Sequence, residues 1–161
     1  MQDFVHLHVH TQYSLLDGQA SVSRLVDKAM KDGMKGIAVT DHGNMFGIKE
    51  FTNYVNKKNS GPKGEIKDLK KRIAGIESGE IECEDKEAEI ADCRAKMAEA
   101  ESKLFKPIVG CEMYVARRTM DKKEGKPDQS GYHLIVLAKN EKGYHNLIKL
   151  VSHAWTRGYY M

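Results

Sequence analysis

Histidine dominates the chemistry-bearing residues of this sequence, which contains seven of them. Three lie near the amino terminus in the stretch FVHLHVH, where His6, His8 and His10 alternate with apolar residues. This alternation predicts a strand over residues 3–10, and side chains two residues apart on a strand project from one face about 6–7 Å apart. His8 and His10 are therefore within joint reach of one metal ion.

Further titratable groups lie within or directly after other short apolar runs. Asp41 and His42 follow GIAVT, Glu112 lies inside IVGCEMYV, and His133 begins HLIVLA. Burial of these groups without partners would cost several kcal/mol in aggregate. A divalent metal removes this conflict, because imidazole nitrogens and carboxylate oxygens become ligands. The mixed donor set favours Zn, Mn or Fe over Mg or Ca.

The candidate ligands outnumber what one tetrahedral ion uses, which predicts a multinuclear centre. Such a centre lowers the pKa of bound water toward neutrality and holds the oxygens of a phosphoryl group during attack. Metal-assisted phosphoester hydrolysis is therefore the predicted reaction class. Two other histidines, His145 and His153, lie on an expected final helix without matching carboxylates, and surface or packing roles are predicted for both.

The elements that must position these groups alternate between strands and helices. After the first strand, the patterns predict a helix over 21–32, a strand over 36–40, a helix over 46–57, strands over 108–115 and 133–138, and a helix from 140. This order is typical of an α/β domain with parallel strands, in which sites form at the carboxyl ends of the strands. His10, Asp41 and His42 lie at such ends.

The segment between the two halves of this pattern has a different composition. Apolar residues recur at three- and four-residue spacing within 66–76 and again within 90–104, and most other positions are charged or alanine. Two amphipathic helices with narrow apolar stripes favour an antiparallel pair. We therefore expect residues 61–103 to form a helical hairpin inserted into the α/β body, after a break at NSGPKG and with its charges in solvent.

Composition excludes several classes of protein. The 161 residues carry 26 basic and 23 acidic side chains and suit one domain, and this charge balance tolerates a nucleic-acid partner without requiring one. A mean hydropathy of -0.58 and the lack of a long apolar stretch exclude a membrane span, and MQDFVHLHVH lacks the features of a secretory signal. Three cysteines without a CxxC pair favour a reduced, cytoplasmic protein.

Longer motifs around the candidate ligands resemble a known family. HVHT followed by YSLLDG, and then AVTDHGN, resemble the first two motifs of the PHP (polymerase and histidinol phosphatase) family. The fuller stretches FVHLHVHTQYSLLDG, AVTDHGNMFG, KPIVGCEMYVA and HLIVLAKNEKGYHNLIKL resemble the PHP region at the amino terminus of bacterial DNA polymerase III α subunits. Residues 1–161 are therefore expected to be the amino-terminal part of a PHP domain.

The resemblance implies part of a distorted, TIM-like (β/α)7 barrel with a trinuclear metal cluster at the carboxyl ends of its strands. By motif, it implies a set of metal ligands: His8, His10, Asp17, His42, Glu112 and His133. Asp41 is expected to orient His42, and His6 is expected to lie behind the ligands in a buried structural role. A metal-activated water, rather than a side chain, is the expected nucleophile.

The implied function is DNA replication. The full-length protein would be a DNA polymerase with DNA and other replicase subunits as partners. This region would be a metal-dependent phosphoesterase acting as a 3′–5′ exonuclease, or a structural remnant of one. Two alternatives remain open: a free-standing small-molecule phosphatase of the histidinol-phosphatase type, and an interaction module in which the histidines only hold the fold.

The sequence departs from the family pattern in two respects. The 61–103 segment is longer than the usual connection at that place, and the distal motifs that supply further ligands are absent, as is the polymerase palm. We therefore expect an amino-terminal fragment of a much longer protein, with an incomplete metal site. The open edge of such a partial barrel is expected to favour dimerisation.

Overall fold

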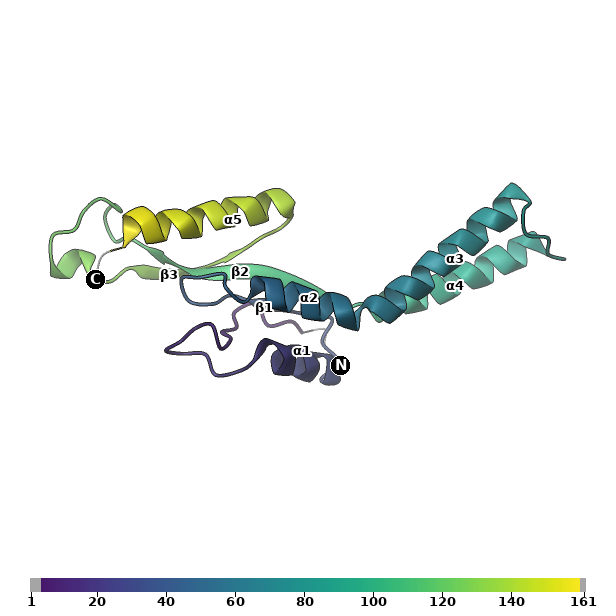
Figure 1. The fold of residues 1–161 in the computed structure, drawn as a ribbon, viewed down its shortest axis with the longest axis horizontal. Helices are drawn as coiled ribbons and strands as arrows, with labels where there is room; N and C mark the ends of the chain where they lie inside the picture. The colour runs from purple at the N-terminus through teal and green to yellow at the C-terminus, as the bar shows by residue number, and fades with distance from the viewer. Residues whose placement is uncertain (1–3, 160–161) are drawn as a thin grey trace. The chain divides into compact units, whose positions relative to one another are not determined.

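A computed structural model describes residues 4–159 (Figure 1). The chain forms two compact units, one from the described residues up to 53 together with those from 106 onward, and the other from residues 54–105. The first unit holds a three-stranded sheet in the order β1-β2-β3, formed by Gly36–Val39, Lys106–Val115 and Tyr132–Leu137. It also contains helices α1 (Val22–Lys31) and α5 (Glu141–His153). The predicted mixed α/β class is confirmed.

The two strand pairs of the sheet run in different senses. β1 lies parallel to β2, with Gly36 opposite Lys106, whereas β2 lies antiparallel to β3, with Tyr114 opposite His133. The prediction of an all-parallel sheet is therefore wrong for the second pair. The reason lies in the connection 116–131, which is polar and contains only the 3₁₀ turn Lys126–Asp128, so no apolar helix packs on the sheet to return the chain in the same direction.

Apolar residues spaced as predicted build the core of this unit. Every residue of β1 is buried, as a short, continuous apolar run predicts. The inward face of α1 consists of Val22, Val26 and Ala29. On the other side of the sheet, Leu147 of α5 packs against Cys111 and Met113 of β2. Burial of this kind supplies about 25 cal/mol per Å² of apolar surface and holds α5 against β2.

The predicted strand over residues 3–10 is not formed in the described part, residues 4–10. This segment lies alongside β1 and accepts two backbone hydrogen bonds at 2.9 Å, from Ala38 N–H of β1 to the His6 carbonyl and from Thr40 N–H, just after β1, to the Val9 carbonyl. A step of two residues, from 38 to 40, thus matches a step of three, from 6 to 9, and a bend at Leu7 takes up the extra residue. The bend breaks the alternation of side chains on which the prediction rested.

The second unit is mainly a pair of helices, α3 (Ser60–Ser78) and α4 (Lys86–Ser102), which lie side by side in Figure 1. Their contact buries Ile76, Cys93 and Ala100, and Arg72 of α3 forms an ion pair with Glu89 of α4. These residues belong to the apolar stripes and charged faces noted in the sequence.

The stretch NSGPKG, where the sequence predicts a break in the α/β pattern, lies at the junction of two helices. Helix α2 (Ile48–Lys58) ends just before it, and α3 begins at its second residue. Pro62 is accommodated because it lies in the first turn of α3, where a backbone N–H has no partner within the helix. Asn59 joins the ends of the unit, since its side chain exchanges two hydrogen bonds, at 2.8 and 2.9 Å, with the backbone of Phe105. Among residues 4–159, no helix has the length and apolar character that crossing a membrane would require.

Candidate metal centre

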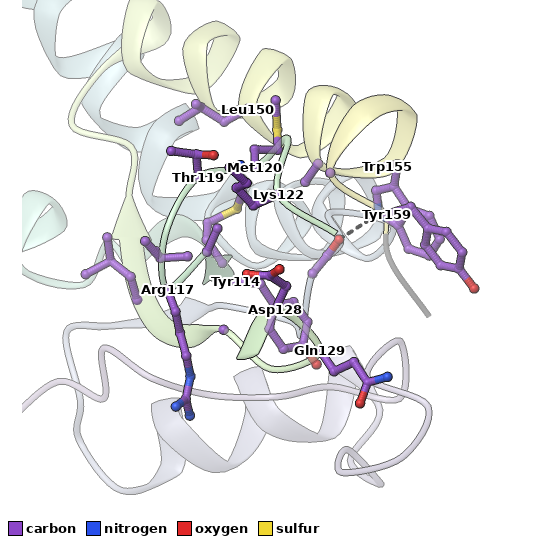
Figure 2. A pocket seen from close by; sticks show the side chains of 18 of the residues that line it. Tyr114, Arg117, Thr119, Met120, Lys122, Asp128, Gln129, Leu150, Trp155 and Tyr159 are labelled. Atoms are coloured by element: carbon purple, nitrogen blue, oxygen red, sulfur yellow. Dashed lines mark hydrogen bonds between the residues drawn. The ribbon is translucent and has the colours of Figure 1, made fainter. Parts of the chain in front are cut away.

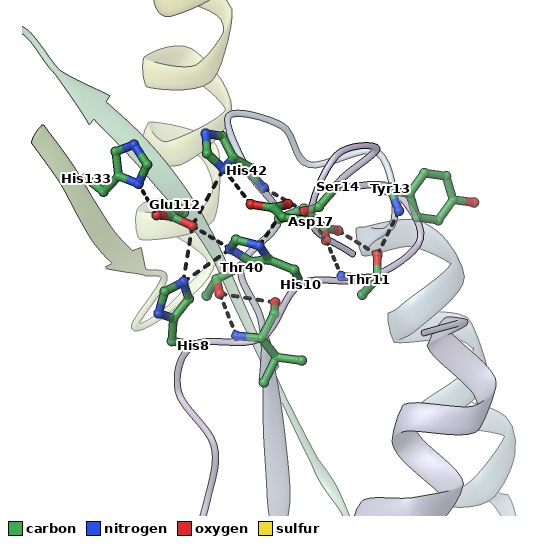
Figure 3. A network of polar contacts seen from close by, with 12 residues as sticks. His8, His10, Thr11, Tyr13, Ser14, Asp17, Thr40, His42, Glu112 and His133 are labelled. Carbon is green, nitrogen blue, oxygen red and sulfur yellow. Dashed lines mark hydrogen bonds and ion pairs between the residues drawn. The ribbon is translucent and has the colours of Figure 1, made fainter. Parts of the chain in front are cut away.

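Titratable side chains from five separate segments converge beside the sheet (Figure 3). They form three sets in which each residue offers one ligand atom within 4.8 Å of the others: His8–His10–Glu112, His10–Asp17–His42 and His42–Glu112–His133. Each pair of sets shares one residue, so the six side chains form a closed arrangement, which we call the His–carboxylate ring. The six ligands that the family resemblance implied are the six members of this ring.

The pairing of β1 with β2 continues into the residues that carry His42 and Glu112. The two residues form a parallel bridge, and backbone hydrogen bonds link the Glu112 amide to the Asp41 carbonyl and the Gly43 amide to the Glu112 carbonyl. Gly43 follows with φ of 66°, a left-handed conformation that glycine adopts without a Cβ clash. The end of β1 thus turns away from the sheet directly after placing His42 beside Glu112.

Glu112 is the centre of the ring. Its Oε2 lies 3.1 Å from His8 Nε2 and in short contact with His10 Nε2, and its Oε1 lies 2.5 Å from His133 Nδ1. Burial raises the pKa of the Glu112 carboxyl, but hydrogen bonds from His8, His133 and His10 outweigh this effect and hold its pKa below the ordinary value. The carboxylate is therefore ionised at neutral pH although only 4 % of the residue is exposed.

His8 and His10 show why the ring suits a cation. Their Nε2 atoms are 3.2 Å apart and both face the same oxygen of Glu112. In the forms that bind metal, these two nitrogens and the carboxylate oxygen each carry a lone pair. The three lone pairs point to one place and repel one another, so a proton or a cation must lie between them. Neutral imidazole and carboxylate are the donors that Zn, Mn and Fe accept, so the residues present fit a divalent transition metal.

Asp17 closes the opposite side of the ring. Its two oxygens lie 3.0 Å from His10 Nδ1 and 3.0 Å from His42 Nδ1. Partial desolvation raises the pKa of the Asp17 carboxyl, but the hydrogen bonds and charges of the two histidines lower it by more, so its net pKa is below the ordinary value. The next residue, Gly18, allows this tight loop, because a Cβ there would lie 1.9 Å from the Thr11 carbonyl oxygen.

Asp41, which the sequence predicts to orient the His42 side chain, instead contacts Thr11 and Ser14 through its carboxyl group. Its carboxyl group is 1 % exposed and accepts hydrogen bonds from the backbone N–H and hydroxyl of Thr11 and from the hydroxyl of Ser14. Ser14 Oγ in turn accepts the His42 backbone N–H at 2.9 Å. Asp41 therefore fixes the loop that carries Asp17 and the backbone of His42, whereas the His42 ring is held by Asp17.

His6 does not have the buried place predicted for it. The residue is exposed, its ring packs edge-on against Phe4, and it belongs to none of the three sets found among residues 4–159. The bend at Leu7 separates it from the face of His8. His145 and His153 are also exposed and lie outside the ring, as predicted.

Tyr114 is the residue that sequence reasoning missed. Its hydroxyl makes a short contact with His42 Nε2, and its ring lies edge-on to that of His133 at 4.9 Å. The signal was present in the sequence, since Tyr114 lies two residues after Glu112 and so shares its face of β2. Cys111 faces the opposite side of β2, toward Leu147, where burial raises the pKa of its thiol to about 11.

Comparison with known proteins identifies the family of the chain. The PHP domain model matches residues 6–161. DNA polymerase III subunit alpha of Borreliella burgdorferi and that of Treponema pallidum are each 39% identical to the chain over 158 residues, which is 98% of this chain and 10% of each relative. The subunit of Aquifex aeolicus is 32% identical over 165 residues, again 10% of its length. The chain thus spans about a tenth of these relatives, and it belongs to the PHP domain family.

Proposed function

We propose that the chain is the amino-terminal PHP region of a bacterial replicative DNA polymerase III α subunit and that its His–carboxylate ring binds divalent metal ions for phosphodiester hydrolysis, as a 3′–5′ exonuclease. The observation that carries the metal-dependent part is the convergence of four imidazoles and two carboxylates from five segments. The replicative part rests on relatives that are named DNA polymerase III subunit alpha.

The ring has room for more than one ion, and its carboxylates decide how the ions would be shared. A neutral imidazole has one lone pair, so His10 can serve only one of the two sets to which it belongs. Glu112 has two oxygens, one facing His8 and His10 and the other facing His133. Glu112 would therefore hold metal together with His8, His10 and His133, and Asp17 would do so together with His10 and His42.

Bound divalent ions would activate water for attack on phosphorus and offset the charge on the phosphoryl oxygens. The chain's own residues set the conditions for that chemistry. Glu112 and Asp17 remain ionised because histidines surround them, and Asp41 holds the Thr11–Ser14 turn that leads to Asp17. The Tyr114 hydroxyl lies beside His42, where it can donate a hydrogen bond to the ring or to a substrate oxygen.

The finer architecture is part of the same proposal. The sheet and its helices would be one portion of a distorted (β/α)7 barrel, and residues 61–103 an inserted helical hairpin. DNA and other replicase subunits would be the partners of the full-length polymerase. None of the described contacts supports the expected dimerisation. No observation favours a free-standing small-molecule phosphatase.

Metal analysis and a nuclease assay test the proposal together. The chain is loaded with Mn²⁺ or Zn²⁺, its metal content is measured, and shortening of a single-stranded oligonucleotide from its 3′ end is followed. We expect bound metal and 3′ shortening, both reduced by His10→Ala, with a rate loss of roughly 100-fold. His145→Ala, an exposed histidine outside the ring, is the matched control and should change neither. Equal rates for wild type and His10→Ala would contradict the exonuclease, and a chain that binds no metal would leave only the structural module.

A further inference from the structure

One side of helix α3 carries a row of basic residues. Their positions follow one another at spacings of four, three and one residues, which places them on one face of a helix that turns about 100° per residue. All of them are exposed, and we call them the lysine row: Lys63, Lys67, Lys70 and Lys71. Together with Ile66 and Ala74 they line a shallow groove of about 480 Å³.

The acidic residues of α3 lie away from this face. By the same angular step, Glu65 and Asp68 fall on the other side of the helix. Glu77 lies beyond the end of the row and forms an ion pair with Arg94 of α4, at 3.9 Å. The positive charges of the row are therefore not interspersed with negative ones.

The row is also uncompensated by the rest of the chain. Among residues 4–159, no carboxylate forms an ion pair with its lysines, and Lys63 donates a hydrogen bond to a neutral group, the side-chain oxygen of Asn56, at 2.9 Å. Other basic residues of the same unit are paired, since Arg72, Lys96 and Lys103 each contact a carboxylate. Opposite charges four residues apart stabilise a helix and like charges destabilise it, so the row carries a repulsion that these pairs avoid.

The row consists of lysine alone, which indicates the kind of anion that it suits. Protein interfaces depend on tryptophan, tyrosine and arginine and are depleted of lysine, and unpaired bases stack on aromatic rings. The row offers none of these side chains. Its length from Lys63 to Lys71 is about 12 Å of helix, over which duplex DNA carries about seven negative charges. The phosphate backbone of a duplex can therefore contact several of the lysines at once.

A larger cleft in the other unit lacks this character (Figure 2). Its volume is about 720 Å³, and its wall, formed in part by α5 and the 116–131 loop, is mainly apolar. The lysine and the arginine that line it both have partners, because Lys122 pairs with Glu124, and Arg117 donates to the Ser130 carbonyl. The cleft therefore offers no row of uncompensated charges to a polyanion.

We propose that the lysine row binds the phosphate backbone of duplex DNA without regard to base sequence. The row belongs to the unit of residues 54–105 and contains no member of the His–carboxylate ring. It is thus a contact separate from the strand end on which an exonuclease would act, and it holds DNA without cleaving it. The inference goes beyond the proposed hydrolysis and does not depend on it.

The salt dependence of binding measures the contact. The chain is titrated with a short fluorescein-labelled DNA duplex at several salt concentrations, with a chelator present to prevent hydrolysis, and anisotropy gives the Kd. Each neutralised phosphate adds about 0.9 to the steepness with which log K falls against log salt. The double variant Lys67→Gln, Lys71→Gln should therefore lower this slope by about 1.8 and weaken binding roughly tenfold or more at low salt.

A matched double variant on α4 separates the row from net charge. Lys96→Gln, Lys103→Gln removes the same charge from lysines that are already paired, and it should change the slope and the Kd much less. Equal effects of the two double variants, or no binding of the duplex by the wild type, would overturn the proposal.

Two further measurements separate this proposal from its alternatives. Poly-glutamate is titrated as a model of an acidic protein, and binding as tight as that of the duplex, with the same loss in Lys67→Gln, Lys71→Gln, would refute DNA as the partner. His10→Ala should leave duplex binding unchanged, because the ring lies in the other unit. A chain that binds the duplex through the row but shortens no 3′ end would keep this inference and refute the exonuclease alone.

Discussion

At the scale of single residues, the site depends on side chains that hold other side chains. Asp41 makes no contact with the ring histidines through its carboxyl group, yet its three hydrogen bonds fix Thr11 and Ser14, and Ser14 fixes the backbone of His42. The histidines would lie in different places without this buried acceptor. Metal sites generally need such outer partners to orient their ligands.

Asp41→Asn tests that dependence. An amide has one acceptor oxygen, so the Thr11 hydroxyl would have to accept from the new NH₂ group, and its own proton would lose its buried acceptor. We expect the free energy of unfolding to fall by about 1–3 kcal/mol, measured by urea denaturation. Asp121→Asn, in the exposed part of the 116–131 loop, should change it by less than about 0.5 kcal/mol. Equal effects would show that Asp41 is not a structural anchor.

At the scale of elements, the 116–131 loop is organised by one arginine. Arg118 forms hydrogen bonds with the carboxylates of Asp128 and Glu124, and Asp128 also accepts the Glu124 backbone N–H at 2.8 Å. The hydrogen bond from Arg118 is the largest of the effects that lower the pKa of the Asp128 carboxyl below its ordinary value. This loop connects the end of β2 to the start of β3.

The loop should therefore depend on pH in a defined direction. Because the pKa of Asp128 is lower in the folded loop than in the unfolded chain, the stabilisation is fully present above the ordinary value of 3.8 and is lost as the pH falls through the folded-state pKa. The Glu124 amide proton, followed by NMR, should titrate with a midpoint below 3.8. Arg118→Gln should move the midpoint upward, and a wild-type midpoint at or above 3.8 would contradict the assignment.

Sequence patterns predicted the elements better than their irregularities. The α/β class, β1, β2 and α5 follow from apolar periodicity, and the six ring residues follow from motifs. The bend at Leu7 escaped prediction because alternation in a sequence says nothing of the register that a neighbouring strand imposes. The antiparallel direction of β3 and the contact of Tyr114 with His42 were not predicted either. Each depends on residues that only the fold brings together.

At the scale of the whole molecule, the ring belongs to one of the two compact units. Its six members lie at positions 8–42 and 112–133, and none lies within 54–105. Metal ions would therefore link the amino-terminal segment, the end of β1, β2 and β3, but no residue of α3 or α4. A ligand that binds only the native state stabilises the elements that carry its binding residues.

Zn²⁺ should accordingly protect one unit and not the other. At a free concentration 100 times its Kd, the ion should raise the opening free energy of β1–β3 amides by about 2.7 kcal/mol, measured by native-state hydrogen exchange. Amides in α3 and α4 should show a much smaller change, and His10→Ala should remove the increment. Equal protection of α3, α4 and the sheet would mean that both units open as one.

The alternation along β2 also limits how its length can change. Cys111 packs against Leu147 while Glu112, the next residue, faces the histidines. One inserted or deleted residue in this strand would exchange the two faces, bringing a thiol to the ions and a carboxylate to the apolar layer. Insertions and deletions are thus confined to places without this alternation, such as the 116–131 loop, so length variation among natural versions of the domain should fall there and spare β2.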